Sequence, residues 1–428
     1  MIWVNVFKRF YPFNTDEVLQ NYVNLYINPT IIQIMIRNIT SSVRFIGVDD
    51  PELDLFESQY AVPEGMSYNS YLILDEKVAV LDTADARKGA QWKANLAEAL
   101  EGRTPDYLVV HHMEPDHSAL VAEMLAQYPA LTLVATAAAL KMLPQFFEGI
   151  ALEGRTLAVK EGDTLALGSH TLRFMMAPMV HWPEVMVSYE PSEKLLFSAD
   201  AFGRFGAMEK IAFWVSDDDD WACEARRYYF NICGKYGVQV QNLLKKVAGL
   251  DIAIICPLHG PILNENLGYH VGLYNIWSSY GVETEGVFVA HASIHGGTAA
   301  AAERFAEMLR EKGCPKVSVA DITRDDLAEC VEDAFRYGKM VLAASSYDGG
   351  VFTPMHDFLY RLQAKGYQQR TVGLIENGSW APSAARVMKE MLGAMKGITV
   401  VEPVVTLRSR MHAEDLPKLE ALADTMLQ

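Results

Sequence analysis

Four side chains of types that bind metal ions stand close together in this sequence, at His112, Glu114, Asp116 and His117. An apolar run, Tyr107–Val110, precedes them, and a segment at Ser118 that suits a helix start follows them. In an extended backbone, alternate side chains project to one side, so His112, Glu114 and Asp116 would face one way and His117 the other. The simplest alternative is a solvated polar loop, which is the better interpretation for any single histidine. The density of ligand types here favours a loop that serves two adjacent metal ions.

Three further candidate ligands follow apolar segments elsewhere in the chain: His181, Asp200 and His259. Each stands at the expected end of a strand and shortly before a turn residue (Pro183, Gly203 and Gly260, respectively). Taken singly, each is better explained as a core histidine or a turn aspartate. Because the same order of apolar segment, candidate ligand and turn residue occurs three times, we expect the three side chains to meet at one edge of the fold.

Composition limits the class of protein. A chain of 428 residues is too long for one ordinary core, which predicts two domains. The net charge of −17 argues against a nucleic-acid partner, and no apolar run is long enough to span a bilayer. The five scattered cysteines contain no CxxC pair, which indicates reduced thiols and a cytoplasmic location.

The domain organisation follows from the order of the patterns. Residues 1–34 differ in composition from the rest, and we expect a disordered extension or a mis-called start. Residues 36–283 alternate short strands with helices, including a hairpin over residues 69–83 that turns at 75–77. The acidic run at 216–221 is expected to cap the following helix at its N-terminus rather than to bind a cation.

A second domain is expected over residues 285–428, where strands, polar loops and helices repeat as βα units. Three loops at the carboxyl ends of parallel strands would surround a crevice, and the first is of a kind that cradles phosphate. An aromatic residue on the second loop and another on the third suit stacking on a flat ring. The loops consist of Ser293, Ile294, His295, Gly296, Gly297 and Thr298; of Ser345, Ser346, Tyr347, Asp348, Gly349 and Gly350; and of Asn377, Gly378, Ser379, Trp380 and Ala381.

The motif HMEPDH, with His181, Asp200 and His259 beyond it, resembles the metallo-β-lactamase-like fold, and within that fold the flavodiiron proteins. Hydrolases of the superfamily commonly have histidine where this chain has Glu114, and a carboxylate there favours iron over zinc. The resemblance implies an αββα sandwich with one iron on His112, Glu114 and His181. It implies a second iron on Asp116, His117 and His259, with Asp200 as a bridge. His111 and His170 match no ligand position and are expected to be structural.

Residues 285–402 resemble flavodoxin, a doubly wound parallel sheet, which implies FMN with its phosphate in the first loop. Families of this type often have an aromatic residue in the first loop where this chain has His295. The combined resemblance implies a cytoplasmic oxidoreductase that reduces O2 to water, NO to N2O, or both. Electrons would reach FMN from an external donor, such as rubredoxin or a reduced flavoprotein. It also implies a head-to-tail homodimer with each FMN beside the partner's irons.

Two alternatives compete with this interpretation. One is a dizinc hydrolase with an accessory flavodoxin-like domain, against which Glu114 argues. The other is an electron carrier with a vestigial metal site, against which the complete set of ligand positions argues. Tyr228 or Tyr229 could donate a proton near the metals, although a packed helix aromatic is the simpler explanation. The sequence does not decide between O2 and NO, and the stretch 53–69 that would line the site contains no histidine.

Overall fold

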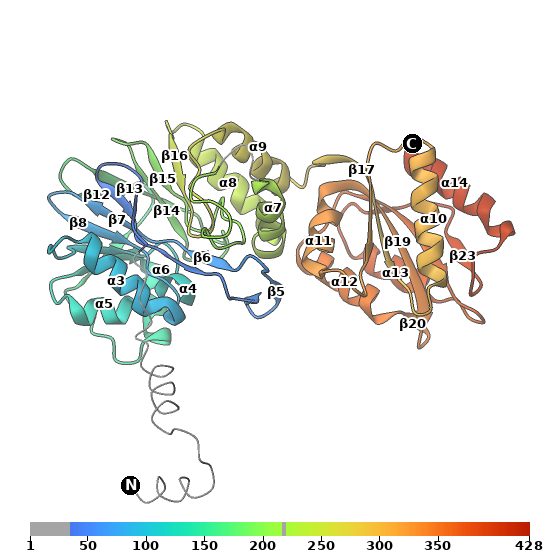
Figure 1. The fold of residues 1–428 in the computed structure, drawn as a ribbon, viewed down its shortest axis with the longest axis horizontal. Helices are drawn as coiled ribbons and strands as arrows, with labels where there is room; N and C mark the ends of the chain where they lie inside the picture. The colour runs from blue at the N-terminus through green and yellow to red at the C-terminus, as the bar shows by residue number, and fades with distance from the viewer. Residues whose placement is uncertain (1–34, 216–219) are drawn as a thin grey trace, which may run out of the picture.

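The computed structural model describes residues 35–215 and 220–428. The expected extension at 1–34 and most of the acidic run lie outside these residues. The N-terminal half contains two packed sheets, and the C-terminal half contains one, with the halves side by side in Figure 1. No helix of the described residues is long and apolar enough to cross a membrane.

The first sheet of the N-terminal half has the order β1-β2-β7-β8-β9-β10-β11. Its strands are Arg37–Asn38, Val43–Phe45, Tyr71–Leu74, Val78–Leu81, Tyr107–Val109, Thr132–Thr136 and Thr156–Val159. The hairpin β7–β8 turns at residues 75–77, as the sequence predicts. Strands β8, β9, β10 and β11 run parallel. The first three are mostly buried, which explains their continuous apolar sequences, whereas three of the four residues of the edge strand β11 are exposed.

The second sheet has the order β12-β13-β14-β15-β16 and is antiparallel except for its last pair. Its strands are Thr164–Ala166, Thr171–Met176, Met186–Glu190, Leu195–Phe197 and Ile254–Cys256. Two short pairs, β3 (Val48–Asp50) with β6 (Met66–Tyr68) and β4 (Leu55–Phe56) with β5 (Tyr60–Ala61), complete the strands of this half. Its longer helices are α3 (Gly89–Ala99), α5 (Val121–Gln127), α6 (Ala137–Phe146), α7 (Trp221–Ile232), α8 (Gly237–Val247) and α9 (Leu267–Ser278).

The sheet of the C-terminal half is parallel along the order β18-β17-β19-β21, with β22 and β23 both beside β21. The strands are β17 (Thr284–Ala292), β18 (Val317–Asp321), β19 (Tyr337–Tyr347), β21 (Thr371–Asn377), β22 (Thr399–Val400) and β23 (Val405–Leu407). Helices α10 (Gly297–Glu311) and α14 (Leu416–Leu427) pack together over one face. Helices α11 (Leu327–Arg336), α12 (Thr353–Ala364) and α13 (Ala384–Gly393) bury apolar residues in the core of the other face. This is the doubly wound sheet expected from the sequence.

Helices α7 and α11 join the two halves along a buried contact. The rings of Phe230 and Phe335 stack with centroids 4.3 Å apart. Arg226 of α7 binds Glu283 with its Nε 2.7 Å from a carboxylate oxygen, and it also binds Glu332 of α11. Farther along, the Lys365 Nζ donates to the Tyr60 hydroxyl at 3.0 Å. Apolar packing and charged pairs therefore hold the halves in one arrangement.

The structure corrects the sequence prediction at the ligand loop. A short helix, α4, begins at Pro115, and not at Ser118, because proline fits the first position of a helix and Glu114 takes the position before it. Asp116 therefore lies in a helical turn, and the expected alternation with period two ends at Glu114. Residues 279–283 connect the halves, since α9 extends to Ser278 and β17 begins at Thr284.

Candidate metal centre and cofactor pocket

All seven predicted ligands lie shortly after strands of the N-terminal half. Strand β9 leads to His112 and Glu114, and α4 then carries Asp116 and His117. His181 follows β13, Asp200 follows β15 and His259 follows β16. The folded sheets thus bring together segments that are far apart in the sequence.

The first group of ligand atoms surrounds Glu114. Its Oε2 lies 3.0 Å from His112 Nε2 and 3.0 Å from His181 Nε2. His181 Nε2 also lies 3.2 Å from Asp200 Oδ2. One atom from each of these four residues falls within 4.8 Å of the others.

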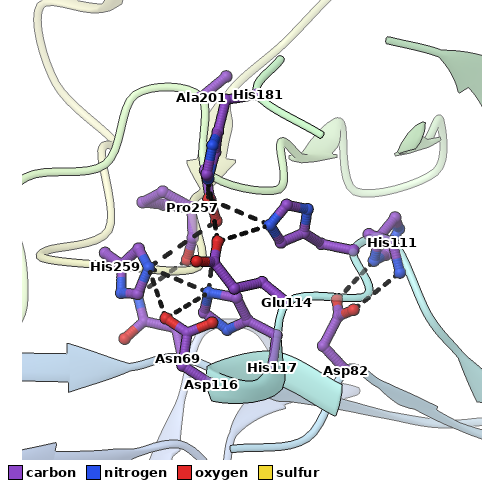
Figure 2. Close-up of polar contacts among 12 residues, drawn as sticks. Asn69, Asp82, His111, Glu114, Asp116, His117, His181, Ala201, Pro257 and His259 are labelled. Carbon is purple, nitrogen blue, oxygen red and sulfur yellow. Dashed lines mark hydrogen bonds and ion pairs between the residues drawn. The ribbon is translucent and has the colours of Figure 1, made fainter. Parts of the chain in front are cut away.

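The second group consists of Asp116, His117 and His259, all buried. His117 Nε2 lies 3.0 Å from His259 Nε2, and Asp116 Oδ2 lies 3.5 and 3.4 Å from these two nitrogens. Asp200 Oδ1 lies 3.3 Å from His117 Nε2. Asp200 therefore turns one oxygen to each group, and Figure 2 shows Glu114, Asp116, His117, His181 and His259 converging on this region.

Hydrogen bonding shows that this cluster suits cations. The carboxylate oxygens of Asp116 and Asp200 are buried and accept no hydrogen bond from any described residue. Buried carboxylates without such partners are costly unless a cation binds them. His259 Nδ1 lies 2.7 Å from the Ser67 carbonyl oxygen, so Nδ1 donates there and the Nε2 lone pair faces the cluster. Imidazole and carboxylate groups in this mixture are ligands of non-haem iron.

The charges of the cluster interact strongly. Burial lowers the pKa of His112 and of His259 to about 3. Burial acts in the same sense on His117, but the neighbouring charges of Asp116 and Asp200 outweigh it and raise the pKa to about 9. The carboxylates thus favour positive charge at His117, and a bound metal ion would supply positive charge at the same place.

The two histidines expected to be structural lie outside both groups. His111 Nδ1 lies 2.7 Å from Asp82 Oδ2, and its Nε2 lies 2.7 Å from Ser188 Oγ. Figure 2 shows the His111–Asp82 pair to one side of the cluster. His170 lies 2.7 Å from Asp75 through Nδ1. Both rings have partners of their own, which explains their burial.

The two candidate tyrosines of α7 differ in position. The Tyr228 ring lies 5.6 Å from the His259 ring, and its hydroxyl is buried with no hydrogen-bond partner among the described residues. The Tyr229 ring packs on Trp277 and Tyr274, with centroids 5.5 and 5.2 Å away. Tyr228 is therefore the better placed of the two to reach a group bound at the metals.

Two solvent-accessible cavities flank the cluster. One, of about 250 Å³, is lined by Glu114 and Asp116 together with Phe56 and Tyr68. The other, of about 370 Å³, is lined by His181 and includes Lys365 of the C-terminal half. The stretch 53–69, which the sequence places at the site, supplies Glu57 to both cavities.

A cavity of about 620 Å³ lies at the carboxyl ends of the C-terminal strands. Of the seventeen residues expected in the three loops, all but Gly296, Thr298 and Gly350 line it. Thr298 lies below the surface, where its hydroxyl is 2.9 Å from Ser345 Oγ and 3.2 Å from the Asn377 side-chain nitrogen. Trp380 is 90% exposed and Tyr347 47% exposed, so both aromatic side chains are available to a ligand.

Three lining residues were missed by the sequence analysis: Ser383, Ser409 and Arg410. The last two belong to a fourth loop, which follows β23. The signal for them was a further strand, loop and helix unit, since an apolar run ends at Leu407 and a helix begins at Leu416.

Comparisons with known proteins agree with this geometry. The family described as "ODP family beta lactamase" matches residues 66–260, which include all seven candidate ligands. The anaerobic nitric oxide reductase flavorubredoxin of Salmonella arizonae is 29% identical over 329 residues, covering 76% of this chain and 67% of that longer protein.

Two solved structures extend the match to both halves. The rubredoxin oxygen:oxidoreductase of Desulfovibrio gigas superposes with a TM-score of 0.85 at 24% identity, covering 92% of this chain and 98% of that one. The flavodiiron protein of Giardia intestinalis gives 0.84 at 22% identity, covering 92% and 96%. This chain therefore shares the fold of these two structures across both halves. The metallo-β-lactamase-like and flavodoxin-like fold expected from the sequence is therefore confirmed.

Proposed function

We propose that the protein is a flavodiiron oxidoreductase that reduces O2 to water, NO to N2O, or both, with two irons and one FMN per chain. The observation that supports this most directly is the position of Asp200, whose two oxygens face two separate ligand groups. A carboxylate with this geometry suits a dinuclear centre. The cavity of the C-terminal half provides a second cofactor site of a size that suits a flavin.

The names of the similar proteins support the same chemistry. The Salmonella relative is called a nitric oxide reductase, and the Desulfovibrio structure is called an oxygen:oxidoreductase. Iron bound at the cluster supplies Lewis-acid and redox chemistry, and reduced FMN supplies electrons. The hydrolase alternative is not favoured, because Glu114 adds a hard oxygen ligand between two imidazoles.

The residues of this chain have separable tasks in that reaction. His112, Glu114 and His181 would hold one iron, Asp116, His117 and His259 the other, and Asp200 both. The buried side chains of Phe56 and Tyr228 and the partly buried ring of Trp182 would limit water around the ligands. The Tyr228 hydroxyl, which has no other partner among the described residues, would donate a hydrogen bond to a substrate bound at the metals. Burial raises the pKa of Tyr228 well above its ordinary value, so the hydroxyl keeps its proton.

Electron supply and assembly are part of the proposal. The flavin pocket opens at the carboxyl end of β17, whereas the amino end of β17 follows the N-terminal half. The nine residues of β17 span about 30 Å, so the pocket is remote from its own metal cluster. A head-to-tail homodimer would place each flavin next to the partner's metals. The electron donor would be a separate cytoplasmic protein, such as rubredoxin or a reduced flavoprotein.

The first test is composition followed by reactivity. Protein purified without oxygen should contain about two irons and one FMN per chain, as expected from the two ligand groups and the pocket of the C-terminal half. Flavin-reduced, iron-loaded protein should then be mixed with O2 and with NO in stopped flow, and the rate of flavin oxidation compared. Stoichiometric zinc without flavin, or flavin oxidation equally fast after iron removal, would contradict the proposal.

A further inference from the structure

The fourth loop of the cofactor pocket, Arg408–Ser409–Arg410, is held in place by the other loops. The Asn377 side chain clamps the backbone of Ser409, since its nitrogen donates to the Ser409 carbonyl at 3.0 Å and its oxygen accepts from the Ser409 N–H at 2.9 Å. The hydroxyls of Ser409 and Ser379 lie 2.6 Å apart. Ser409 has the left-handed φ of 68°, which only a well-fixed loop tolerates at a residue other than glycine. These hydrogen bonds therefore fix the fourth loop as part of the wall of the pocket.

Contacts of Ser409 place this loop at the end of the pocket where the first loop lies. A Cβ atom on Gly297 would come within 2.3 Å of the Ser409 carbonyl oxygen, so the two backbones touch there. Gly297 is the first residue of α10, whose N-terminus has no side-chain cap. The Ser293 hydroxyl of the first loop is also buried without a hydrogen-bond partner among the described residues. Free backbone donors and an unpaired hydroxyl at a helix N-terminus suit an anion.

Arg410, which follows Ser409 in this loop, adds a positive charge to the lining of the pocket. Among the lining residues it is the only arginine or lysine, and Asp348 is the only carboxylate. Over residues 35–215 and 220–428, no carboxylate forms an ion pair with the Arg410 guanidinium. Arg408, two residues earlier, is exposed as well but does not line the pocket. Both arginines carry the same charge and are exposed, but only Arg410 lines the cavity.

We propose that Arg410 binds the phosphate of the flavin and makes the pocket select FMN over unphosphorylated riboflavin. This inference rests on the proposed flavin function and assigns the residue that recognises the phosphorylated end. A guanidinium presents paired N–H donors that match phosphate oxygens, and a charge-assisted hydrogen bond of this kind is stronger than a neutral one. The ring would remain between the second and third loops, where Tyr347 and Trp380 stand.

The test compares two ligands that differ only in the phosphate. Flavin is removed from the full-length protein, and FMN and riboflavin are titrated by quenching of flavin fluorescence. Arg410→Gln should weaken FMN binding about 10- to 100-fold and leave riboflavin binding unchanged. Arg408→Gln, the matched control, should change neither, and Arg410→Lys should retain part of the FMN affinity. The salt dependence of FMN binding should be smaller in Arg410→Gln than in the unmodified protein.

Several results would overturn the assignment. Equal losses for FMN and riboflavin would mean that Arg410 acts on the ring or on folding of the loop. If Arg410→Gln leaves the affinity for FMN unchanged, or if Arg408→Gln weakens it equally, Arg410 does not make a specific contact with the phosphate. Thermal unfolding of each variant shows whether the fold is intact. Failure of the unmodified protein to bind either flavin is a different result, because it would contradict the proposed function itself.

Discussion

The Nε2 atoms of His117 and His259 lie 3.0 Å apart, although 142 residues separate the two histidines in the chain. His259 donates through Nδ1 to the Ser67 carbonyl, so its Nε2 has a lone pair to offer. His117 reaches the same point from helix α4, where Pro115 starts the turn that carries it. Segments that follow strands of two different sheets thus supply this pair of candidate ligands, and Asp116 completes the group.

Metal removal should destabilise the folded protein. Asp116 and Asp200 are buried without hydrogen bonds to described residues, so a bound cation should stabilise their charges. We expect chelation to lower the melting temperature by about 5 °C or more, because a ligand at 100 times its Kd contributes about 2.7 kcal/mol. Calorimetry before and after chelation measures this. His170→Gln, a change outside both groups, should keep the full response to metal; an unchanged melting temperature on chelation would contradict the prediction.

Replacement of Glu114 should change metal preference. Glu114→His exchanges a hard oxygen for an imidazole, so we expect the ratio of iron to zinc to fall several-fold in protein loaded from an equal mixture. Elemental analysis provides the measurement. Glu57→His is the matched control, since Glu57 lines both cavities but belongs to neither ligand group. If Glu114→His retains the original ratio, Glu114 is not a ligand.

Loss of Asp200 should be more damaging than loss of a ligand to one metal. Asp200→Ala removes a contact to both groups and the negative charge between them, whereas Glu114→Ala affects the first group alone. We expect Asp200→Ala to retain less than half of the iron that Glu114→Ala retains. Iron content and the visible spectrum of each variant report this. An equal or milder loss in Asp200→Ala would exclude the bridging role.

The sequence predicted the ligand types and the strand ends because both depend on local pattern. It placed Asp116 incorrectly, since the helix-starting effect of Pro115 competes with the alternation of the preceding residues. It missed Arg410 because β22 and β23 are short and are separated by a segment containing Pro403, which cannot donate to a sheet. The two oxygens of Asp200 face different ligand groups because of distances in the folded structure, and no local sequence pattern contains these distances.

A pH effect should arise where the halves meet. Arg226 already binds Glu283 through two nitrogens, so Glu332 shares a guanidinium with another carboxylate inside the core. Burial raises the pKa of Glu332 from 4.5 to about 8, despite the charge of Arg226. A raised pKa gives stability that is complete below pH 4.5 and is lost as the pH rises through 8.

Glu332→Gln should remove that dependence. We expect the unfolding free energy of the unmodified protein to fall by about 1 kcal/mol or more between pH 5 and pH 9 relative to the variant, since one pKa unit corresponds to about 1.4 kcal/mol. Urea unfolding at several pH values gives the comparison. Glu307→Gln, which alters an exposed carboxylate on α10, is the control. Parallel pH profiles for Glu332→Gln and the unmodified protein would contradict the assignment.

Transfer of electrons between chains can be tested by mixing two inactive variants. Glu114→Ala impairs the metal cluster, and Gly297→Val blocks the flavin pocket, because its Cβ would clash with the Ser409 carbonyl oxygen at 2.3 Å. Each homodimer then lacks one kind of site, so each should be nearly inactive. In a mixed dimer arranged head to tail, the intact flavin of one chain faces the intact metals of the other.

Co-expression with two affinity tags, followed by sequential purification, isolates that mixed dimer. We expect up to about half of the activity of the unmodified dimer, because one of two equivalent sites is complete. A pure mixed dimer with no activity above either parent would mean that flavin and metals of the same chain react together.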